Sequence, residues 1–347
     1  LLLARGLRAR GHGCHLAVQR GSPLESRACQ AGLRVLPFRS HGEFDPLAAL
    51  CLASHLRAVR PHLVHYHTSH AIMLGTLASL RAGRRPSLAT RRVSFPLSRN
   101  PLARFKYTYR VDRIIAVSNG IRDTLLAEGI PAERTAVIPS AVDLDRFRSL
   151  ADRTDSRRSL EVEPAEFLVG SIGHLAAHKG YRVLVEAARL ARRTHPLLRF
   201  LLIGRGEGEK EIRSQVDAAG LGSAFRLLGF REEVATILPA LDLLVFPSLS
   251  GEGSPAVLKE AMACGVPIVA SDITGVHEVV RSGIEGLLVP PGDPVVLAEA
   301  ILRVARERHL GLEFTRRGRE RCLAFGVERL VEQTESLYGE LLENRRP

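Results

Sequence analysis

The sequence predicts an α/β protein with two domains, each a mostly parallel, doubly wound sheet. Short apolar runs alternate with amphipathic helical patterns along almost the whole chain, as expected for repeated βαβ crossovers. The chain has 347 residues, of which 45% are hydrophobic, and this is enough for two separate cores. The alternation is interrupted once, by the polar residues 149–166, which predict a linker between the domains.

Strand and helix patterns alternate in the first domain, which is expected at residues 1–150. Apolar runs of strand length occur at 15–18, 33–38, 63–67, 113–117 and 135–138, and another strand is expected to end at Thr90–Ser94. Apolar residues recur at helical spacing in 1–10, 48–59, 71–80 and 119–128. Because the first pattern is a helix, this sheet is expected to lack its opening strand.

The alternation restarts in the second domain, which is expected at residues 151–326. Its strands are expected at 167–172, 199–203, 225–228, 243–247, 267–271 and 286–289. Its helices are expected at 182–194, 210–219, 233–240, 256–263, 276–281 and 294–308, and a last helix follows at 327–343. Open parallel sheets bind ligands at the carboxyl ends of their strands, so a site is expected there in each domain.

The charge of the chain is distributed unevenly. Residues 1–150 hold 23 Lys and Arg against 9 Asp and Glu, whereas residues 151–347 hold 26 against 28. From Pro46 to Val111 there are eleven basic residues and no acidic one. This excess favours an anionic membrane surface as a partner, or else a solvated basic surface without a partner. Nucleic acid is disfavoured, because only 5% of the residues are aromatic and no RNA-binding signature occurs.

The cysteines and the hydropathy pattern indicate the compartment. Five cysteines are scattered without a Cys-x-x-Cys pair, which predicts reduced thiols rather than disulfides or a metal site. No run of eighteen apolar residues occurs, and the leucine-rich start is too short and too soon basic for a secretory signal. The expected location is the cytoplasm, with peripheral association at the inner face of the cytoplasmic membrane if the basic surface docks there.

One segment joins a strand, a loop of small residues, a helix and a second strand, and it carries two glutamates. It reads Phe246-Pro-Ser-Leu-Ser-Gly-Glu-Gly-Ser-Pro-Ala-Val-Leu-Lys-Glu-Ala-Met-Ala-Cys-Gly-Val-Pro-Ile-Val-Ala-Ser271. Gly253 and Ser254 allow close backbone approach at a helix start, where an anion such as a diphosphate is favoured. Glu252 suits the hydroxyls of a sugar and Glu260 those of a ribose, because carboxylates accept charge-assisted hydrogen bonds. Taken alone, the two glutamates could equally be capping and surface residues.

This segment resembles the signature of glycosyltransferase family 4, in which two glutamates are separated by seven residues and followed by an Ala-Met-Ala-Cys-Gly-Val-Pro run. Further similar segments follow the family's order along the chain, at 115–118, 137–147, 169–180, 201–206, 228–231 and 285–293. The resemblance covers nearly the whole chain and is strongest over 111–293. It implies the GT-B fold, with two Rossmann-like domains facing each other across a cleft and the segment 327–347 crossing back to the first domain.

The resemblance also implies the roles of residues in the second domain. Lys179, before Gly180 at a helix start, would stabilise the charge that develops on the diphosphate as the sugar leaves. Lys179 and Glu252 are therefore expected to be catalytic, and Glu260 to hold the ribose. The other expected donor-binding residues are Gly253, Ser254, His174, Gly204, Gly229, Phe230 and Arg231.

One expected donor-binding residue departs from the family's pattern, and several residues of the first domain have alternative interpretations. His174 stands where many relatives have an arginine, so either His174 is a weaker, pH-dependent contact, or Arg182 or another arginine compensates, or the donor pocket differs. In the first domain, His67 ends a strand and matches a family histidine near the reacting sugar, so it is the third residue expected to be catalytic. The alternative is a histidine at a strand end whose hydrogen bonds are satisfied within the protein. Arg91 and Arg92 could meet an anionic acceptor or add to the basic face. Ser118 could orient the acceptor or cap the following helix.

The expected activity is retaining transfer of a sugar from a UDP- or GDP-sugar to a glycan, lipid-linked or lipopolysaccharide-type acceptor, with no cofactor and no metal. Nucleic acid is not an expected partner. A nucleotide-sugar epimerase of the same fold and a truncated, non-catalytic relative are the alternatives. A dinucleotide oxidoreductase is disfavoured, because no Gly-x-Gly-x-x-Gly follows a first strand. Relatives open with a strand and a glycine-rich loop, so the chain is expected to be a fragment of a longer product, or else to lack a complete catalytic site.

Overall fold

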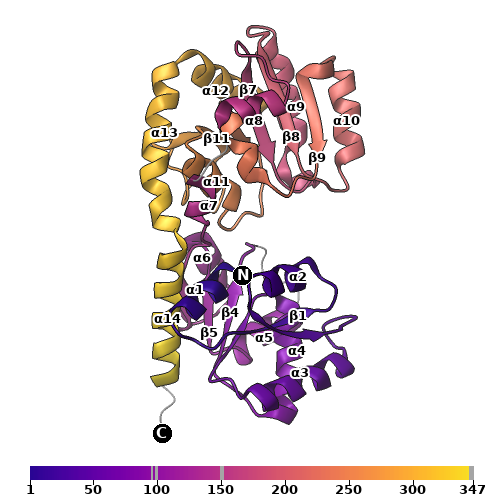
Figure 1. Ribbon diagram of the computed structural model, residues 1–347, viewed down its shortest axis with the longest axis vertical. Helices are drawn as coiled ribbons and strands as arrows, with labels where there is room; N and C mark the ends of the chain where they lie inside the picture. Colours follow the sequence, from indigo (N-terminus) through magenta and orange to yellow (C-terminus); the bar gives the residue numbers. More distant parts are fainter. Residues whose placement is uncertain (95–96, 98–100, 149–151, 344–347) are drawn as a thin grey trace. The chain divides into compact units, whose positions relative to one another are not determined.

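The computed structural model describes residues 1–94, 97, 101–148 and 152–343. The chain divides into two compact units, one formed by Leu1–Ala141 together with Val327–Pro347 and the other by Val142–Gly326 (Figure 1). The second unit therefore begins earlier than the predicted boundary at 150. Phe147 explains the difference, because its ring is buried in the core of the second unit, and the Val142 amide donates to the Phe325 carbonyl at 2.9 Å.

The first unit contains two parallel sheets. Four strands lie in sequence order in one sheet: β3 (Val64–Tyr66), β4 (Ser87–Arg91), β5 (Arg113–Ala116) and β6 (Thr135–Val137). Two further strands, β1 (His15–Gln19) and β2 (Arg34–Phe38), pair only with each other in the described part of the chain. The carboxyl ends of β3, β4 and β5 all lie at one edge, because neighbouring strands run in the same direction.

Seven helices of the described chain surround these sheets, and six of them precede the second unit in the sequence. They are α1 (Leu2–Ala9), α2 (Pro23–Gln30), α3 (Pro46–Val59), α4 (Ser69–Ala82), α5 (Pro101–Tyr109), α6 (Asn119–Ala127) and α14 (Val327–Glu343), and a 3₁₀ turn, η1, covers Ala132–Arg134. Leu337 and Leu341 of α14 share a core with Leu88 and Ile115 of the sheet. The α1 and α14 helices lie side by side, and a Cβ at Gly6 would stand only 2.3 Å from Val331.

The second unit contains one parallel sheet with the order β12-β11-β10-β7-β8-β9. Its strands are β7 (Phe167–Ile172), β8 (Leu198–Ile203), β9 (Phe225–Gly229), β10 (Leu243–Phe246), β11 (Ile268–Ser271) and β12 (Gly286–Val289). Starting from β7, the chain adds β8 and β9 on one side and then β10, β11 and β12 on the other. The strand order therefore reverses between β7 and β10, and such a switch point is where doubly wound sheets bind their ligands.

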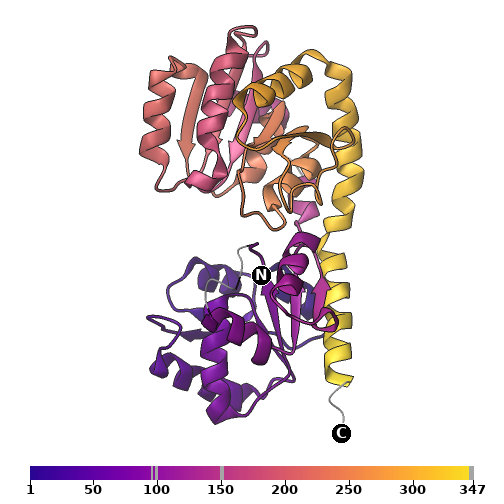
Figure 2. The same cartoon turned by 180° about the vertical axis from the view of Figure 1, so that it is seen from behind.

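Helices cover both faces of this sheet (Figure 2). They are α7 (Leu144–Arg148), α8 (Arg153–Ser159), α9 (Tyr181–Arg192), α10 (Glu209–Ala218), α11 (Ala256–Cys264), α12 (Pro294–Arg306) and α13 (Arg308–Cys322), with 3₁₀ turns η2 (Ala177–Lys179), η3 (Gly222–Ala224), η4 (Val234–Thr236), η5 (Leu238–Ala240) and η6 (Leu323–Phe325). Two large apolar clusters fill the spaces between the helices and the sheet. No helix in the described part of the chain is both long and apolar enough to cross a bilayer.

Most predicted elements are present, but three predictions are wrong. The predicted helix 233–240 is two short 3₁₀ turns, because Pro239 has no backbone N–H to continue an α-helix. The predicted helix 276–281 consists of turns. Its valines have helical spacing because all three are buried against the core, although the backbone is not helical. The predicted linker 149–166 contains α8 in its described part, whereas 149–151 lie outside the described residues.

Five helices of the described residues are not predicted by the sequence pattern: α2, α5, α7, α8 and α13. Four of them are short, and α13 is strongly charged. Only Phe314, Gly318 and Cys322 of α13 are buried, at a spacing of four residues, so its apolar stripe is too narrow to stand out.

Candidate functional site

The loops that follow β7 and β10 lie directly against each other at the switch point. Gly180 has a φ of +67° between η2 and α9, and a Cβ there would stand 2.0 Å from the Pro247 carbonyl oxygen. A side chain would therefore collide with backbone, so this position requires glycine. The Leu249 amide also donates to the His178 carbonyl at 2.7 Å. These two contacts hold Lys179 beside the loop that carries Glu252.

Lys179 and Glu252 form an ion pair at this place. The Lys179 ammonium donates to Oε1 of Glu252 at 2.5 Å, and the Ser248 hydroxyl donates to the same oxygen at 2.8 Å. The two side chains are only 19% and 9% exposed. The Lys179 Nζ also lies 5.8 Å from the centroid of the Phe246 ring. The structure thus brings together Lys179 and Glu252, two of the three residues that were predicted to be catalytic, although 73 positions separate them in the sequence.

Burial and charge around the pair also act on Tyr181, the first residue of α9. Burial, and secondarily the negative charge of Glu252, raise the pKa of the Tyr181 hydroxyl above its usual value. Tyr181 therefore keeps its proton at neutral pH and is a neutral hydrogen-bonding group beside the pair.

Gly253 and Ser254 lie between Glu252 and the start of α11. A Cβ at Gly275 would stand 2.3 Å from the Gly253 carbonyl oxygen, so the loop after β11 packs closely against this one. The Ser254 hydroxyl accepts a hydrogen bond from the Lys259 ammonium at 2.5 Å. The Lys259 side chain is completely buried, and the sequence analysis did not identify it. Its only signal was a cation among the apolar residues of α11, directly before Glu260.

Glu260 is half-buried on α11. Burial raises the pKa of its carboxyl, while the positive charges of Arg146 and Lys259 act in the opposite direction. Arg146 belongs to the short helix α7 and also pairs with Glu233 at 2.9 Å. The sequence analysis included Arg146 in a family-like segment but gave it no role. An arginine near the carboxylate that is expected to hold the ribose is a second cation of this site.

The loop after β8 packs on the loop after β7. Gly204 has a φ of +150°, and a Cβ there would stand 1.8 Å from the Gly173 carbonyl oxygen. A Cβ at Gly206 would stand 2.6 Å from the Leu175 carbonyl oxygen. His174 lies in this region and pairs with Glu207 at 3.1 Å, with both side chains well exposed. His174 thus lies at the carboxyl ends of β7 and β8 with an acidic neighbour.

The predicted residues after β9 form an exposed corner. Gly229 has a φ of +70°, and its carbonyl accepts from the Gly204 amide at 2.9 Å. Phe230 is 56% exposed, and the Arg205 guanidinium lies 4.9 Å from the centroid of its ring. Arg231 is also exposed. An exposed aromatic ring beside a cation is a surface on which a planar base can stack.

A separate polar cluster lies at the carboxyl ends of β3 and β4 in the first unit. One ring nitrogen of His65 lies 2.6 Å from the Tyr338 hydroxyl of α14, and the other lies 2.7 Å from the Thr90 hydroxyl. The ring centroids of His65 and His67 are 4.2 Å apart. The Arg92 guanidinium lies 3.3 Å from Nδ1 of His67. His67 and Arg92, both predicted from the sequence, are therefore neighbours. His65, which is held by Tyr338 and Thr90, packs its ring beside that of His67.

Both histidines of this cluster favour the neutral form. Burial, followed by the nearby positive charge of Arg92, lowers the pKa of His67 to about 4. Burial also lowers the pKa of His65 well below its usual value, with smaller contributions from His67 and Arg92. At neutral pH the imidazoles are therefore uncharged. Because the Arg92 guanidinium can only donate, Nδ1 of His67 accepts from it and Nε2 of His67 carries the ring proton, so Nε2 is a hydrogen-bond donor.

The other two predicted residues of the first unit point elsewhere. Arg91 is 7% exposed, and its guanidinium lies 5.3 Å from the centroid of the Tyr107 ring, so it does not contribute to a basic face. Successive strand residues point to opposite sides, which separates Arg91 from Arg92. Ser118 is buried and accepts from the Ile121 amide at 3.3 Å, and this contact caps α6.

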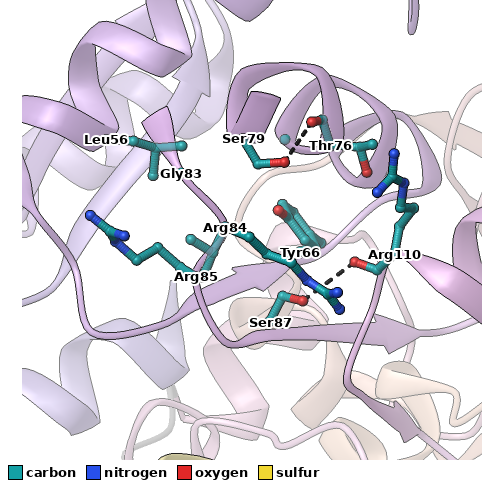
Figure 3. Close-up of a pocket in the computed structure, with 11 residues that line it drawn as sticks. Leu56, Tyr66, Thr76, Ser79, Gly83, Arg84, Arg85, Ser87 and Arg110 are labelled. Carbon is teal, nitrogen blue, oxygen red and sulfur yellow. Dashed lines mark hydrogen bonds between the residues drawn. The ribbon is translucent and has the colours of Figure 1, made fainter. Parts of the chain in front are cut away.

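Among the described residues, no three His, Cys, Asp or Glu side chains are grouped so that they could hold a metal ion. Asp143 and Asp145 have an Asp-x-Asp spacing that the sequence analysis overlooked, but they begin α7, where the Asp143 carboxylate accepts from the Arg146 amide at 3.3 Å. A small hollow in the first unit is lined in part by Val64 and Ser87, the first residues of β3 and β4, and its lining contains none of the predicted site residues (Figure 3). Its lining includes Tyr66, Arg84 and Arg110.

Comparison with known proteins defines the class of this fold. The chain superposes on the crystal structure of Anabaena HepE in complex with UDP and glucose with a TM-score of 0.87 and 25% sequence identity, over 97% of this chain and 94% of that one. Two family profiles match successive parts of the chain: Glycosyltransferase Family 4 over residues 1–146 and Glycosyl transferases group 1 over residues 152–321. The fold is GT-B, as predicted.

The chain belongs to glycosyltransferase family 4, the glycosyl transferases of group 1. It is 29% identical over 200 residues to the amylovoran biosynthesis glycosyltransferase AmsK of Erwinia amylovora, covering 56% of this chain and 47% of AmsK. It is 24% identical over 315 residues to an Escherichia coli protein, UDP-Gal:alpha-D-GlcNAc-diphosphoundecaprenol alpha-1,3-galactosyltransferase, covering 87% of this chain and 81% of that protein. The chain spans about half the length of several curated relatives that it matches.

Proposed function

We propose that this protein transfers a sugar from a nucleotide-sugar donor, held by the second unit, to a glycan or lipid-linked acceptor. The observation that carries this proposal is the pairing of Lys179 with Glu252 at the point where the strand order reverses. A cation, a carboxylate and the amino end of α11 lie along one edge of the sheet. This combination suits a ligand that has a diphosphate at its centre and hydroxyl groups at both ends.

Lys179 is proposed to act on the leaving group. An ammonium carries three protons, and the pair with Glu252 uses one of them. The remaining protons are donors for the diphosphate, on which negative charge grows as the bond to the sugar breaks. Because the side chain is held by Glu252 and the Phe246 ring, it does not have to be ordered during the reaction.

The two glutamates are proposed to hold the two ends of the donor. Glu252 has its Oε1 engaged by Lys179 and Ser248, which orients Oε2 for a sugar hydroxyl. Glu260 is proposed to accept from the ribose hydroxyls, with Arg146 favouring its ionised form. The ring of Phe230 is proposed as the surface on which the base stacks.

The names of relatives support the donor and acceptor classes. The matched HepE structure contains UDP and glucose, and the Escherichia coli relative is named for a UDP-galactose donor and a diphosphoundecaprenol-linked acceptor. We therefore propose a UDP-sugar before a GDP-sugar, and an acceptor from cell-envelope polysaccharide or lipopolysaccharide synthesis. His67 and Arg92 of the first unit are proposed to lie on the acceptor side, where Nε2 of the neutral His67 imidazole can donate a hydrogen bond to an acceptor hydroxyl oxygen.

Retention of the anomeric configuration and independence of metal ions are part of the proposal. The test begins with thermal unfolding in the presence of UDP, GDP and ADP, because a ligand at one hundred times its Kd adds about 2.7 kcal/mol. The sugar nucleotide of the preferred base is then incubated with and without a lipid-linked acceptor. Proton NMR of the product gives its anomeric configuration, and EDTA should leave the rate unchanged. Conversion of the donor without acceptor would instead indicate an epimerase, and a lack of binding to all three nucleotides would contradict the proposal.

A membrane surface is proposed as the place where the acceptor is met. On α3, Leu47 and Leu50 are 75% and 45% exposed, and Leu80 near the end of α4 is 69% exposed. Arg57 follows Leu50 on the exposed side of α3 and donates to the Arg81 carbonyl at 2.8 Å. Exposed leucines beside arginines suit the boundary between acyl chains and anionic headgroups. This patch lies within the acid-free stretch from Pro46 to Val111, although Arg99 of that stretch lies outside the described residues.

A further inference from the structure

Lys259 is a completely buried cation beside the proposed donor site. Its exposed fraction is 0%, and it belongs to α11, whose other buried members are apolar. The ammonium donates to the Ser254 hydroxyl at 2.5 Å, lies 3.5 Å from the Ser254 carbonyl oxygen, and stands 4.7 Å from the centroid of the Phe325 ring. Withdrawing a lysine from water is costly, so packing alone would be served better by an apolar residue.

The hydrogen bond from Lys259 controls the direction of the Ser254 hydroxyl. A serine hydroxyl has one proton and two acceptor lone pairs. Since Lys259 can only donate, it occupies a lone pair of Ser254 Oγ and directs the hydroxyl proton away from itself. That proton then becomes a donor on the other side of Ser254, next to the first turn of α11, where the backbone amides also favour an anion.

We propose that Lys259 is a positioning residue that makes Ser254 a hydrogen-bond donor to the diphosphate of the nucleotide-sugar. The inference rests on the proposed function, since it assigns a role at the same site. Lys259 acts through Ser254 and also brings a fixed positive charge under the loop, which strengthens the attraction of this helix start for phosphate.

Glu260 supplies independent support, because it is the next residue on α11. The charge of Lys259 lowers the pKa of the Glu260 carboxyl, against the increase that burial causes. The charged or titratable groups that influence Glu260 or are influenced by it are Lys259 itself, Arg146 of α7 and Cys264 at the end of α11. One buried cation thus supports two groups of the donor site, one on each side of it in the sequence.

The experiment compares Lys259→Met, Ser254→Ala and the double variant in the full chain, with Lys210→Met as control. Methionine fills the same volume without charge, and Lys210 is an exposed lysine of α10 in the same unit. Binding of UDP and of GDP is measured by calorimetry, and thermal unfolding is measured on the same samples. Lys259→Met should weaken binding of the preferred nucleotide by about tenfold, the effect of one lost charge-assisted hydrogen bond. Lys210→Met should bind as the wild type does.

Two readouts distinguish positioning from simple packing. If Lys259 acts through Ser254, the double variant should bind no more weakly than the weaker single variant, whereas multiplied losses would overturn the inference. Lys259→Met should also unfold at the wild-type temperature or above, because replacing a buried charge by an apolar group of similar size is often neutral or stabilising. Parallel loss of stability and affinity would mean a packing role.

The stability readout needs no ligand, so it separates this inference from the proposed function. If the wild type binds neither nucleotide, the donor function fails. The contact between Lys259 and Ser254 is then judged from the unfolding of the wild type, the two single variants and the double variant. Non-additive changes in their stability support the contact, and strictly additive changes overturn it.

Discussion

The ion pair between Lys179 and Glu252 can be broken from either side, and the two single variants should resemble each other in stability but differ in function. Glu252→Gln keeps the shape of the side chain and removes its charge, which leaves the Lys179 ammonium without its carboxylate. Lys179→Met leaves the Glu252 carboxylate with the Ser248 hydroxyl and without its cation. In the double variant neither charge remains.

The expected size of the effect follows from the exposure of the two side chains. Removing one partner of a fully buried ion pair costs about 3–5 kcal/mol, because the other charge stays buried. Here 19% of Lys179 and 9% of Glu252 remain exposed, so water relieves part of the cost. We expect about 2–3 kcal/mol for either single variant, a decrease of roughly 5–10 °C in Tm for a unit of this size. The double variant should lose less than either single variant, because it leaves no unpaired charge buried.

The assay combines unfolding with turnover. Thermal and urea unfolding of the intact chain are followed by circular dichroism, and separate transitions are fitted separately, because two units need not unfold together. Release of nucleoside diphosphate measures turnover. Lys179→Met should lower kcat by a factor on the order of 100 or more, because the leaving diphosphate loses its cation. Glu252→Gln should lower kcat while affinity for the bare nucleoside diphosphate stays intact, because the glutamate is proposed to act on the sugar.

An exposed ion pair in the same unit serves as the control for the loss of an ion pair at the surface. Glu209 and Arg213 form an ion pair on α10, 2.8 Å apart, but both are considerably more exposed. Glu209→Gln should cost only about 0.3–0.5 kcal/mol. Additive losses in the Lys179–Glu252 double variant would refute the reasoning, and so would a Glu252→Gln variant with wild-type turnover.

Three further predictions concern the ribose, the histidines and the membrane. Glu260→Ala should cost about 1.5–3 kcal/mol of donor binding, and unchanged nucleoside diphosphate affinity in calorimetry would contradict its role. The depressed pKa of His65 means that the unfolded chain binds a proton that the folded chain resists, so stability should be present above pH of about 6.5 and decline as pH falls below it. Urea titrations at several pH values should show a smaller decline in His65→Gln. Arg57→Glu with Arg81→Glu should weaken co-sedimentation with anionic vesicles by at least about 2 kcal/mol, and wild-type binding no stronger to anionic than to neutral vesicles would contradict membrane docking.

Local patterns in the sequence were sufficient for the elements whose apolar residues are regularly spaced. The strands from β7 to β12 follow from short apolar runs, and α9, α11 and α12 follow from helical spacing. Elements with weak or misleading patterns were missed. The valines at 276–280 have the spacing of a buried helical face although they lie in turns. The many charged residues of α13 leave too few apolar ones for its helical pattern to be recognised.

The residues of the proposed donor site could be predicted from the sequence, because a short motif keeps them at a constant spacing. Glu252, Gly253, Ser254 and Glu260 stand in one segment of the chain. Lys259 lies in the same segment but was overlooked, since its role depends on where its ammonium points. Arg146 was overlooked because its influence on Glu260 crosses more than a hundred positions.

The sequence by itself determined the fold class and the family and predicted the residues of the proposed donor site, because these depend on periodicity and on motifs of fixed spacing. Only the tertiary structure decided which side chains meet. It paired Lys179 with Glu252 through the parallel alignment of β7 and β10, and it separated Arg91 from Arg92 through the alternation of a strand. Spacing along the chain does not contain such pairings, because they follow from strand order and from the direction of each side chain in the packed protein.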